Sequence, residues 1–169
     1  RRRARLLVHT EIRTPIMSTR TGSSNNAYIL WGTPHSLYTG KVRSYLLKKG
    51  IGFRELTPAH PDFKQRILPA VGLFVVPVLE TPEGEIVQDS SDIIACLESR
   101  FPANAMLPAT PVQRVVTLLL DGFGSEGMLA NAMHYRWTYR AQQENFLAAE
   151  FGRSVYSGPD RAQQRAAGA

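Results

Sequence analysis

Residues 31–56 read WGTPHSLYTGKVRSYLLKKGIGFREL, and this stretch decides the fold. It continues the short apolar run Ala27 to Trp31, whose aromatic and branched residues, ended by Gly-Thr-Pro, predict a buried strand. From Tyr38 the apolar residues take helical spacing, and Gly50 supplies a stop signal. Ile51 to Leu56 then predicts a second strand. Because two strands joined by a helical crossover pair in parallel, the stretch predicts a β-α-β unit.

A hairpin and a further helix are expected next. Residues 75–88, VVPVLETPEGEIVQ, contain two strand-like pieces, Val76 to Glu80 and Glu85 to Gln88, separated by turn residues. The proline-rich segment before them leaves room for only a short helix around residues 63–67. A capped apolar stripe after the hairpin predicts a helix that packs on the sheet. The order βαβ, then ββα, closes one α/β unit at about Pro102.

The rest of the chain predicts a small second domain. Residues 103–111 have the composition of a linker, and helical character resumes at Val112. Glycines weaken the first helix, and a second amphipathic helix follows. We therefore expect a short all-α domain over residues 112–153 and a disordered tail over residues 154–169.

The net charge of +6 comes mostly from the first residues. Residues 1–16 carry five arginines and one glutamate, which leaves about +2 for the rest. Residues 1–26 show no sustained period and predict a disordered basic leader. Either this leader is a targeting peptide, or residues 1–16 precede a native start at Met17. A nucleic-acid binder would rest on this leader alone, so no nucleic-acid partner is expected.

Cysteine content and hydropathy limit the class of protein. Cys96 is the single cysteine, so no internal disulfide or cysteine-built metal site is possible, and no metal is expected. This usage fits a reducing compartment, which predicts a cytoplasmic protein. The longest apolar run, Val71 to Leu79, falls short of the ~20 residues that span a bilayer, so no membrane partner is expected.

Four stretches resemble the glutathione S-transferase family. They are residues 31–56, the VPVL at 76–79, the QDSSDIIACLE at 88–98, and a helical segment after a proline-rich linker. The resemblance covers residues 27–102 well and the helical segment only in general character. It implies an α/β thioredoxin-like domain that binds glutathione, followed by helices that form a pocket for a hydrophobic electrophile. Detoxification and a homodimer are further implications.

The resemblance also implies the glutathione contacts. Pro77 matches the family's cis-proline, after which Val76 would offer its backbone N–H and C=O to the cysteinyl part of glutathione; a trans proline at the start of a strand is the alternative. Asp89 and Ser90 match the acidic-Ser pair, which would bind the γ-glutamyl ammonium and carboxylate at a helix N-terminus. The alternative for Ser90 is a simple helix N-cap.

Ser36 stands where relatives carry a catalytic serine or cysteine. Redox members of the wider thioredoxin-like group use Cys-x-x-Cys at this turn, but Ser36 and Thr39 carry no thiol, so disulfide exchange is excluded. A serine can instead donate a hydrogen bond to the glutathione sulfur and stabilise its thiolate. Tyr38 is the second candidate for this donor, and Thr33 lies in the same turn. Ser36 can also serve simply as the helix cap.

The sequence also departs from the family pattern. Leu37 replaces the proline that often follows the serine, and the spacer after Pro69 is longer than usual. Residues 134–137, His-Tyr-Arg-Trp, are interpreted as core with pocket lining as the alternative. Lys41 and Arg43 are interpreted as solvated helix charges. Because the helical part looks short, a noncatalytic glutathione-binding or protein-interaction module is the alternative function.

Overall fold

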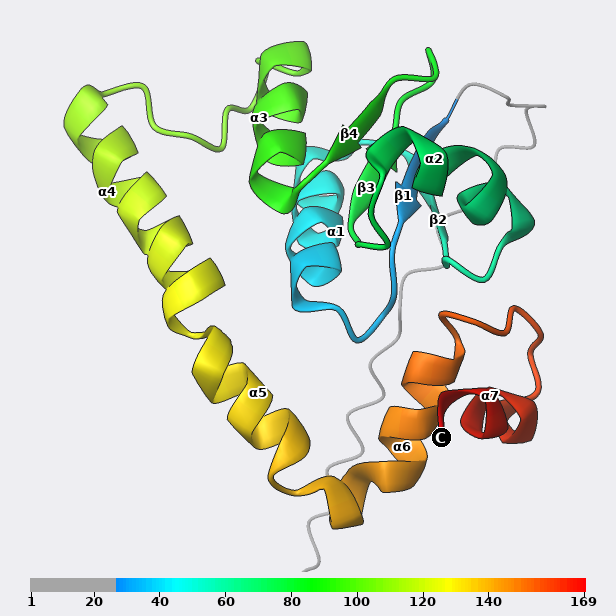
Figure 1. Cartoon of the computed structure of the whole chain (residues 1–169). Helices are drawn as coiled ribbons and strands as arrows, with labels where there is room; N and C mark the ends of the chain where they lie inside the picture. The colour runs from blue at the N-terminus through cyan, green and yellow to red at the C-terminus, as the bar shows by residue number, and fades with distance from the viewer. Residues whose placement is uncertain (1–26) are drawn as a thin grey trace, which may run out of the picture.

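The computed structural model describes residues 27–169, so the predictions for residues 1–26 lie outside the described part of the chain. A four-stranded sheet in the order β2-β1-β3-β4 forms the N-terminal unit (Figure 1). Its strands are β1 (Tyr28–Trp31), β2 (Phe53–Leu56), β3 (Val78–Glu80) and β4 (Ile86–Gln88). β1 is parallel to β2 and antiparallel to β3, which is antiparallel to β4. The predicted β-α-β unit and the hairpin are confirmed.

Two helices cover one face of this sheet. Helix α1 (Leu37–Lys49) connects β1 to β2 and lies beside α3 (Ser90–Arg100). Gly50 ends α1 with φ 70°, a left-handed conformation that glycine adopts without a Cβ clash. The fully buried core between these helices and the sheet consists of Leu30, Val42, Leu46, Leu79, Ile93 and Leu97.

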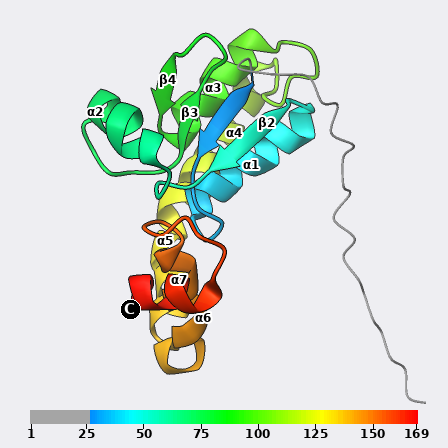
Figure 2. The same cartoon turned by 90° about the vertical axis from the view of Figure 1, so that its right-hand side faces the viewer.

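The opposite face has its own core, because neighbouring strand residues point to opposite sides. Trp31 follows Leu30 in β1 and packs instead against Phe63, with ring centroids 5.8 Å apart. Phe63 begins the short π-helix η1 (Phe63–Ile67), which continues into α2 (Leu68–Val71). The Trp31 indole donates to the buried Glu80 carboxylate at 3.2 Å, which satisfies its N–H inside the core. Figure 2 shows α1 and α2 on opposite sides of the sheet. This α/β unit is thioredoxin-like, as expected.

The second unit is entirely helical. It consists of α4 (Pro111–Gly122), the π-helix η2 (Phe123–Gly127), α5 (Leu129–Trp137), α6 (Arg140–Gly152) and α7 (Arg161–Gly168). Figure 1 shows α4 and α5 as one long arm that runs past the sheet, with α6 turning back and α7 against it. The arm places α5 and α6 below the end of the sheet where α1 begins.

Two features of this unit correct or extend the sequence prediction. The tail predicted as disordered, residues 154–169, contains α7, whose N-cap Asp160 accepts a hydrogen bond from the Ala162 N–H at 2.8 Å. Helix α7 packs tightly on α6, so residues far from the predicted core still gain tertiary contacts. Helix α4, in contrast, leaves a row of aliphatic side chains exposed: Val112, Val115, Val116, Leu118, Leu119 and Leu120.

Candidate functional site

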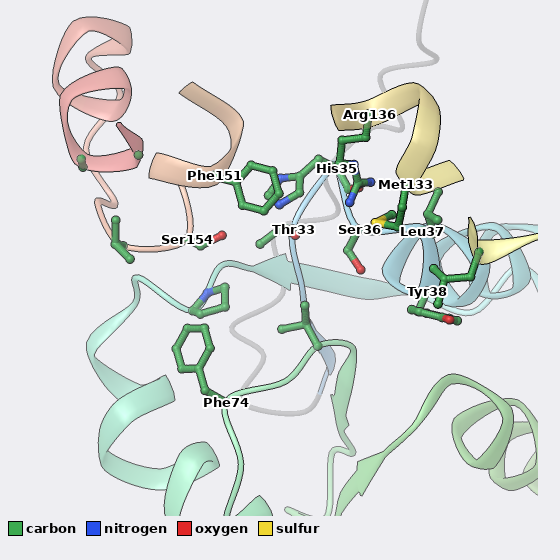
Figure 3. Close-up of a pocket in the computed structure, with 16 residues that line it drawn as sticks. Thr33, His35, Ser36, Leu37, Tyr38, Phe74, Met133, Arg136, Phe151 and Ser154 are labelled. Carbon is green, nitrogen blue, oxygen red and sulfur yellow. The ribbon is translucent and has the colours of Figure 1, made fainter. Parts of the chain in front are cut away.

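The turn between β1 and α1 carries the first predicted site residue, Ser36. Its Oγ accepts a hydrogen bond from the Thr39 N–H at 3.2 Å, so Ser36 is the N-cap of α1. A hydroxyl that accepts this bond still has a proton to donate. Within residues 27–169 that proton is donated to no other group. Figure 3 shows the Ser36 hydroxyl directed into a cavity, where a bound molecule can accept a hydrogen bond from it.

Tyr38, the second candidate, has its hydroxyl engaged elsewhere. The phenol donates to the backbone carbonyl of Ser125 in η2 at 2.9 Å. Burial raises the pKa of the Tyr38 hydroxyl, and the carboxylates of Glu126 and Asp89 raise it further, so the group stays protonated at neutral pH. Its one proton is therefore used to join α1 to the helical unit.

The loop before β3 presents a free backbone edge. The Val76–Pro77 peptide bond is cis, as the resemblance implies. Among the described residues, neither the N–H nor the C=O of Val76 bonds to another backbone group. Val76 lines the same cavity as Ser36, so an extended ligand there has one backbone donor and one acceptor within reach.

At the start of α3 the structure corrects one alternative. The N-cap is Asp89, whose carboxylate accepts from the Ser91 N–H at 2.8 Å, so the interpretation of Ser90 as the cap is wrong. Asp89 has φ 78°, a conformation that residues with a Cβ rarely adopt and that gathers at functional sites. Ser90 is only 4% exposed, and its hydroxyl contacts no hydrogen-bond partner in the described part of the chain.

A cavity of about 510 Å³ lies where the two units meet. The turn contributes His35 and Ser36, the loop before β3 contributes Phe74 and Val76, and the helical unit contributes Met133, Arg136 and Phe151 (Figure 3). Most of these groups are apolar, which suits a hydrophobic ligand held beside a few polar atoms. The structure thus brings Ser36, Tyr38 and Val76 to one cavity, whereas Asp89 and Ser90 do not line it.

His35 and Phe151 line the cavity and were missed by sequence reasoning. Their rings pack with centroids 4.2 Å apart. Burial lowers the pKa of the His35 imidazole, and the positive charge of Arg136 lowers it further, so His35 is neutral at pH 7. Its Nδ1 is buried without a hydrogen-bond partner among the described residues. The position of His35 beside Ser36 was a usable signal; Phe151 gave none, because only the return of α6 brings it here.

The segment His134 to Trp137 is divided between the cavity and the surface. Arg136 lines the cavity, and its Nη2 donates to the His35 carbonyl at 2.8 Å. Tyr135 is 66% exposed and Trp137 45% exposed. The interpretation of this segment as plain core is therefore wrong, and the pocket alternative holds for Arg136 alone.

Lys41 and Arg43 are not freely solvated charges either. Lys41 Nζ lies 2.8 Å from Asp121 in α4 and 3.1 Å from the Ser91 hydroxyl in α3. Arg43 binds both oxygens of Glu55, at 2.6 and 2.7 Å. The Lys41 contacts join α1, α3 and α4, and they hold the helical unit beside the turn that carries Ser36.

Three further observations concern chemistry outside the cavity. In residues 27–169 no group of three His, Cys, Asp or Glu side chains is arranged to hold a metal ion. No helix of the described chain is long and apolar enough to cross a membrane. Cys96 is a free, half-buried thiol on α3.

Comparison with known proteins agrees with this architecture. Residues 30–105 match the family model of the glutathione S-transferase N-terminal domain. No curated protein matches the sequence significantly.

Solved structures match over most of the chain. The beta-etherase LigF from Sphingobium superposes with a TM-score of 0.55 at 22% identity, over 83% of this chain and 62% of its own. A glutathione S-transferase from Methylobacterium radiotolerans, in complex with glutathione sulfonate, superposes with a TM-score of 0.50 at 25% identity, over 85% of this chain and 64% of its own. A Tau class glutathione S-transferase from mango superposes with a TM-score of 0.53 at 15% identity, over 85% of this chain and 57% of its own. This chain thus spans about three fifths of their lengths. Residues 30–105 are thus similar to the glutathione S-transferase N-terminal domain, and the likeness of the following helices rests on the solved structures.

Proposed function

We propose that this chain binds glutathione and conjugates it to a hydrophobic electrophile. The observation that carries this proposal is the Ser36 hydroxyl, which has a free proton and faces an apolar cavity. The matching structure from Methylobacterium radiotolerans holds glutathione sulfonate, which supports glutathione as the ligand.

Glutathione would lie along the loop before β3 and reach the start of α3. Its cysteinyl backbone would pair with the free N–H and C=O of Val76, next to Pro77. The γ-glutamyl carboxylate would accept from the Ser90 hydroxyl and the unpaired amides that begin α3. One oxygen of Asp89 caps the helix, which leaves the other for the glutathione ammonium.

Ser36 would stabilise the thiolate. A thiol with an ordinary pKa of about 8.5 is mostly protonated at neutral pH, so a donor that favours the anion increases the reactive fraction. The thiol proton leaves to solvent, and the Ser36 hydroxyl and the N-terminus of α1 then stabilise the negative sulfur. With a chlorinated nitroarene, the sulfur forms a C–S bond at the carbon that bears chlorine, and chloride leaves with the C–Cl electron pair.

The electrophile would occupy the apolar part of the cavity. Phe74 from the loop before β3, Met133 from α5 and Phe151 from α6 offer polarisable surfaces against an aromatic ring. Because these residues come from both units, the site depends on the contacts that Lys41 and Tyr38 make with the helical unit.

Titration calorimetry with glutathione, followed by conjugation of 1-chloro-2,4-dinitrobenzene, tests the proposal. Saturable binding with turnover above the uncatalysed rate is expected. Failure to bind glutathione would overturn it. Binding without turnover would instead support a noncatalytic glutathione-binding module.

We propose in addition that the chain forms a cytoplasmic homodimer that acts in detoxification. The exposed aliphatic row of α4 supports the dimer, because such a surface in water favours association. The free thiol of Cys96 is consistent with a reducing compartment.

A further inference from the structure

Arg136 places a positive charge in the cavity that the proposed reaction does not use. It projects from α5 toward the turn, where its Nη2 donates to the His35 carbonyl at 2.8 Å (Figure 3). Its Cζ lies 6.0 Å from the centre of the Phe151 ring, which fixes the guanidinium plane beside the apolar wall. One bond to a neutral carbonyl leaves most of its five N–H donors available.

This charge has no counter-ion within the described residues. Six of the ten arginines in residues 27–169 pair with a carboxylate, at positions 43, 66, 100, 140, 153 and 161; Arg136 pairs with none, like Arg54, Arg114 and Arg165, but those three do not line the cavity. The described cavity lining also includes no Asp or Glu. A half-buried cation beside an apolar wall, with no carboxylate in the described lining, is suited to an anionic ligand.

The other ionisable groups of the lining carry no charge. Burial and Arg136 lower the pKa of His35, and burial raises that of Tyr38, so both are neutral at pH 7. Arg136 is therefore the charged side chain of this lining. His35 also leaves a buried Nδ1 without a partner beside it.

Resting on the proposed transferase function, we propose that Arg136 is a specificity-determining residue that selects aromatic electrophiles bearing a carboxylate. The guanidinium would hold the carboxylate by a charge-assisted hydrogen bond, and the ring would lie against Phe151. In the reaction of a chloronitrobenzoate, the glutathione sulfur bonds to the carbon bearing chlorine and chloride departs with the bonding pair. The carboxylate is unchanged and serves only to position the ring.

A matched pair of substrates tests the charge preference. 4-Chloro-3-nitrobenzoate and its methyl ester share ring and leaving group but differ in charge. Because the ester is intrinsically more reactive, each kcat/KM is divided by the uncatalysed rate constant with glutathione. For the wild-type chain we expect this ratio to favour the carboxylate about tenfold, the size of one charge-assisted hydrogen bond.

Three variants separate charge in the cavity from other effects. Arg136→Gln should abolish the preference by lowering the ratio for the carboxylate about tenfold more than the ratio for the ester, whereas Arg136→Lys should retain part of it. Arg140→Gln removes one positive charge at the start of α6, where Arg140 pairs with Glu144, and should behave as wild type.

The outcomes distinguish this inference from the proposed function. Equal ratios for acid and ester in a wild-type chain that turns over both would overturn the role of Arg136 and leave the transferase intact. An equal fall for both substrates in Arg136→Gln, or a rise in KM for glutathione with either substrate, would show that Arg136 positions the turn or glutathione, which also overturns it. No turnover of either substrate would refute the transferase itself, and with it this inference.

Discussion

The Tyr38 hydroxyl donates to the Ser125 carbonyl at 2.9 Å, while the Ser36 hydroxyl, two residues earlier, donates to no described residue. This difference favours Ser36 as the proposed thiolate donor, because a phenol has one proton and Tyr38 has already used it. Ser36 accepts from Thr39 and keeps its proton.

Replacing Ser36 should therefore impair chemistry. Ser36→Ala removes a hydrogen bond to a charged sulfur, so kcat should fall about 10- to 100-fold, with glutathione affinity little changed. At saturating glutathione, the pH profile of kcat/KM for the electrophile should also shift, with the apparent pKa of bound glutathione moving toward about 8.5. Tyr38→Phe should lower stability by about 1 kcal/mol and leave that pKa unchanged.

A glycine variant controls for the lost helix cap. Ser36→Ala also costs about 1 kcal/mol of capping energy, whereas glycine at an N-cap costs only a few tenths. Ser36→Gly should thus lose activity as fully as Ser36→Ala. If Ser36→Gly retained wild-type kcat, the serine would be only a cap.

Two adjacent serines provide a test of the glutathione site. Ser90 is buried with a free hydroxyl, so Ser90→Ala should raise the Kd for glutathione about tenfold in titration calorimetry. Ser91 keeps its N–H bond to Asp89 whatever its side chain, and its hydroxyl faces Lys41. Ser91→Ala should leave the Kd unchanged, and equal effects of the two variants would refute the assignment of Ser90.

Local patterns predicted the α/β unit well because its elements are specified by neighbouring residues. Gly50 ends α1 and Pro77 precedes β3 where the sequence indicated. The cavity was only half predicted. Ser36 and Val76 belong to local motifs, but Phe151 comes from α6, far along the chain, and packs on His35 in the same cavity. The prediction of a disordered tail over residues 154–169 was wrong for the same reason. Helix α7 is stabilised by packing on α6, which the local sequence does not show.

The exposed row on α4 should govern association. Leu119 is 68% exposed, so Leu119→Gln places a polar group on this surface without creating a cavity in the core. Light scattering after size exclusion should show a dimer for the wild type and a shift toward monomer for the variant. Leu47 on α1 is 64% exposed and provides a control, since Leu47→Gln should leave the mass unchanged. A monomeric wild type would contradict the dimer.

His35 should make the fold sensitive to acid. Its pKa in the folded chain is lowered, chiefly by burial, so the unfolded state binds the proton more readily. The neutral His35 side chain contributes its full stabilisation above the pKa of histidine in the unfolded chain, about 6.5. This contribution is lost as the pH falls through the pKa of His35 in the folded chain. The free energy of unfolding from urea titrations should thus decline below about pH 6.5, less steeply for His35→Gln.

The contact between α6 and α7 can be tested with two glycines. A Cβ at Gly152 would lie 1.7 Å from the Gln164 carbonyl oxygen, and a backbone atom in a packed helix cannot move aside cheaply. Gly152→Ala should lower the free energy of unfolding by about 1–3 kcal/mol or detach α7. At Gly124 a Cβ would meet nothing within 4 Å, so Gly124→Ala should stabilise the chain by about 0.5–1 kcal/mol. Because α7 adds Ala167 and Gly168 to the cavity wall, its detachment should also reduce conjugation. Equal stability of the two variants would show that α7 does not rest on α6.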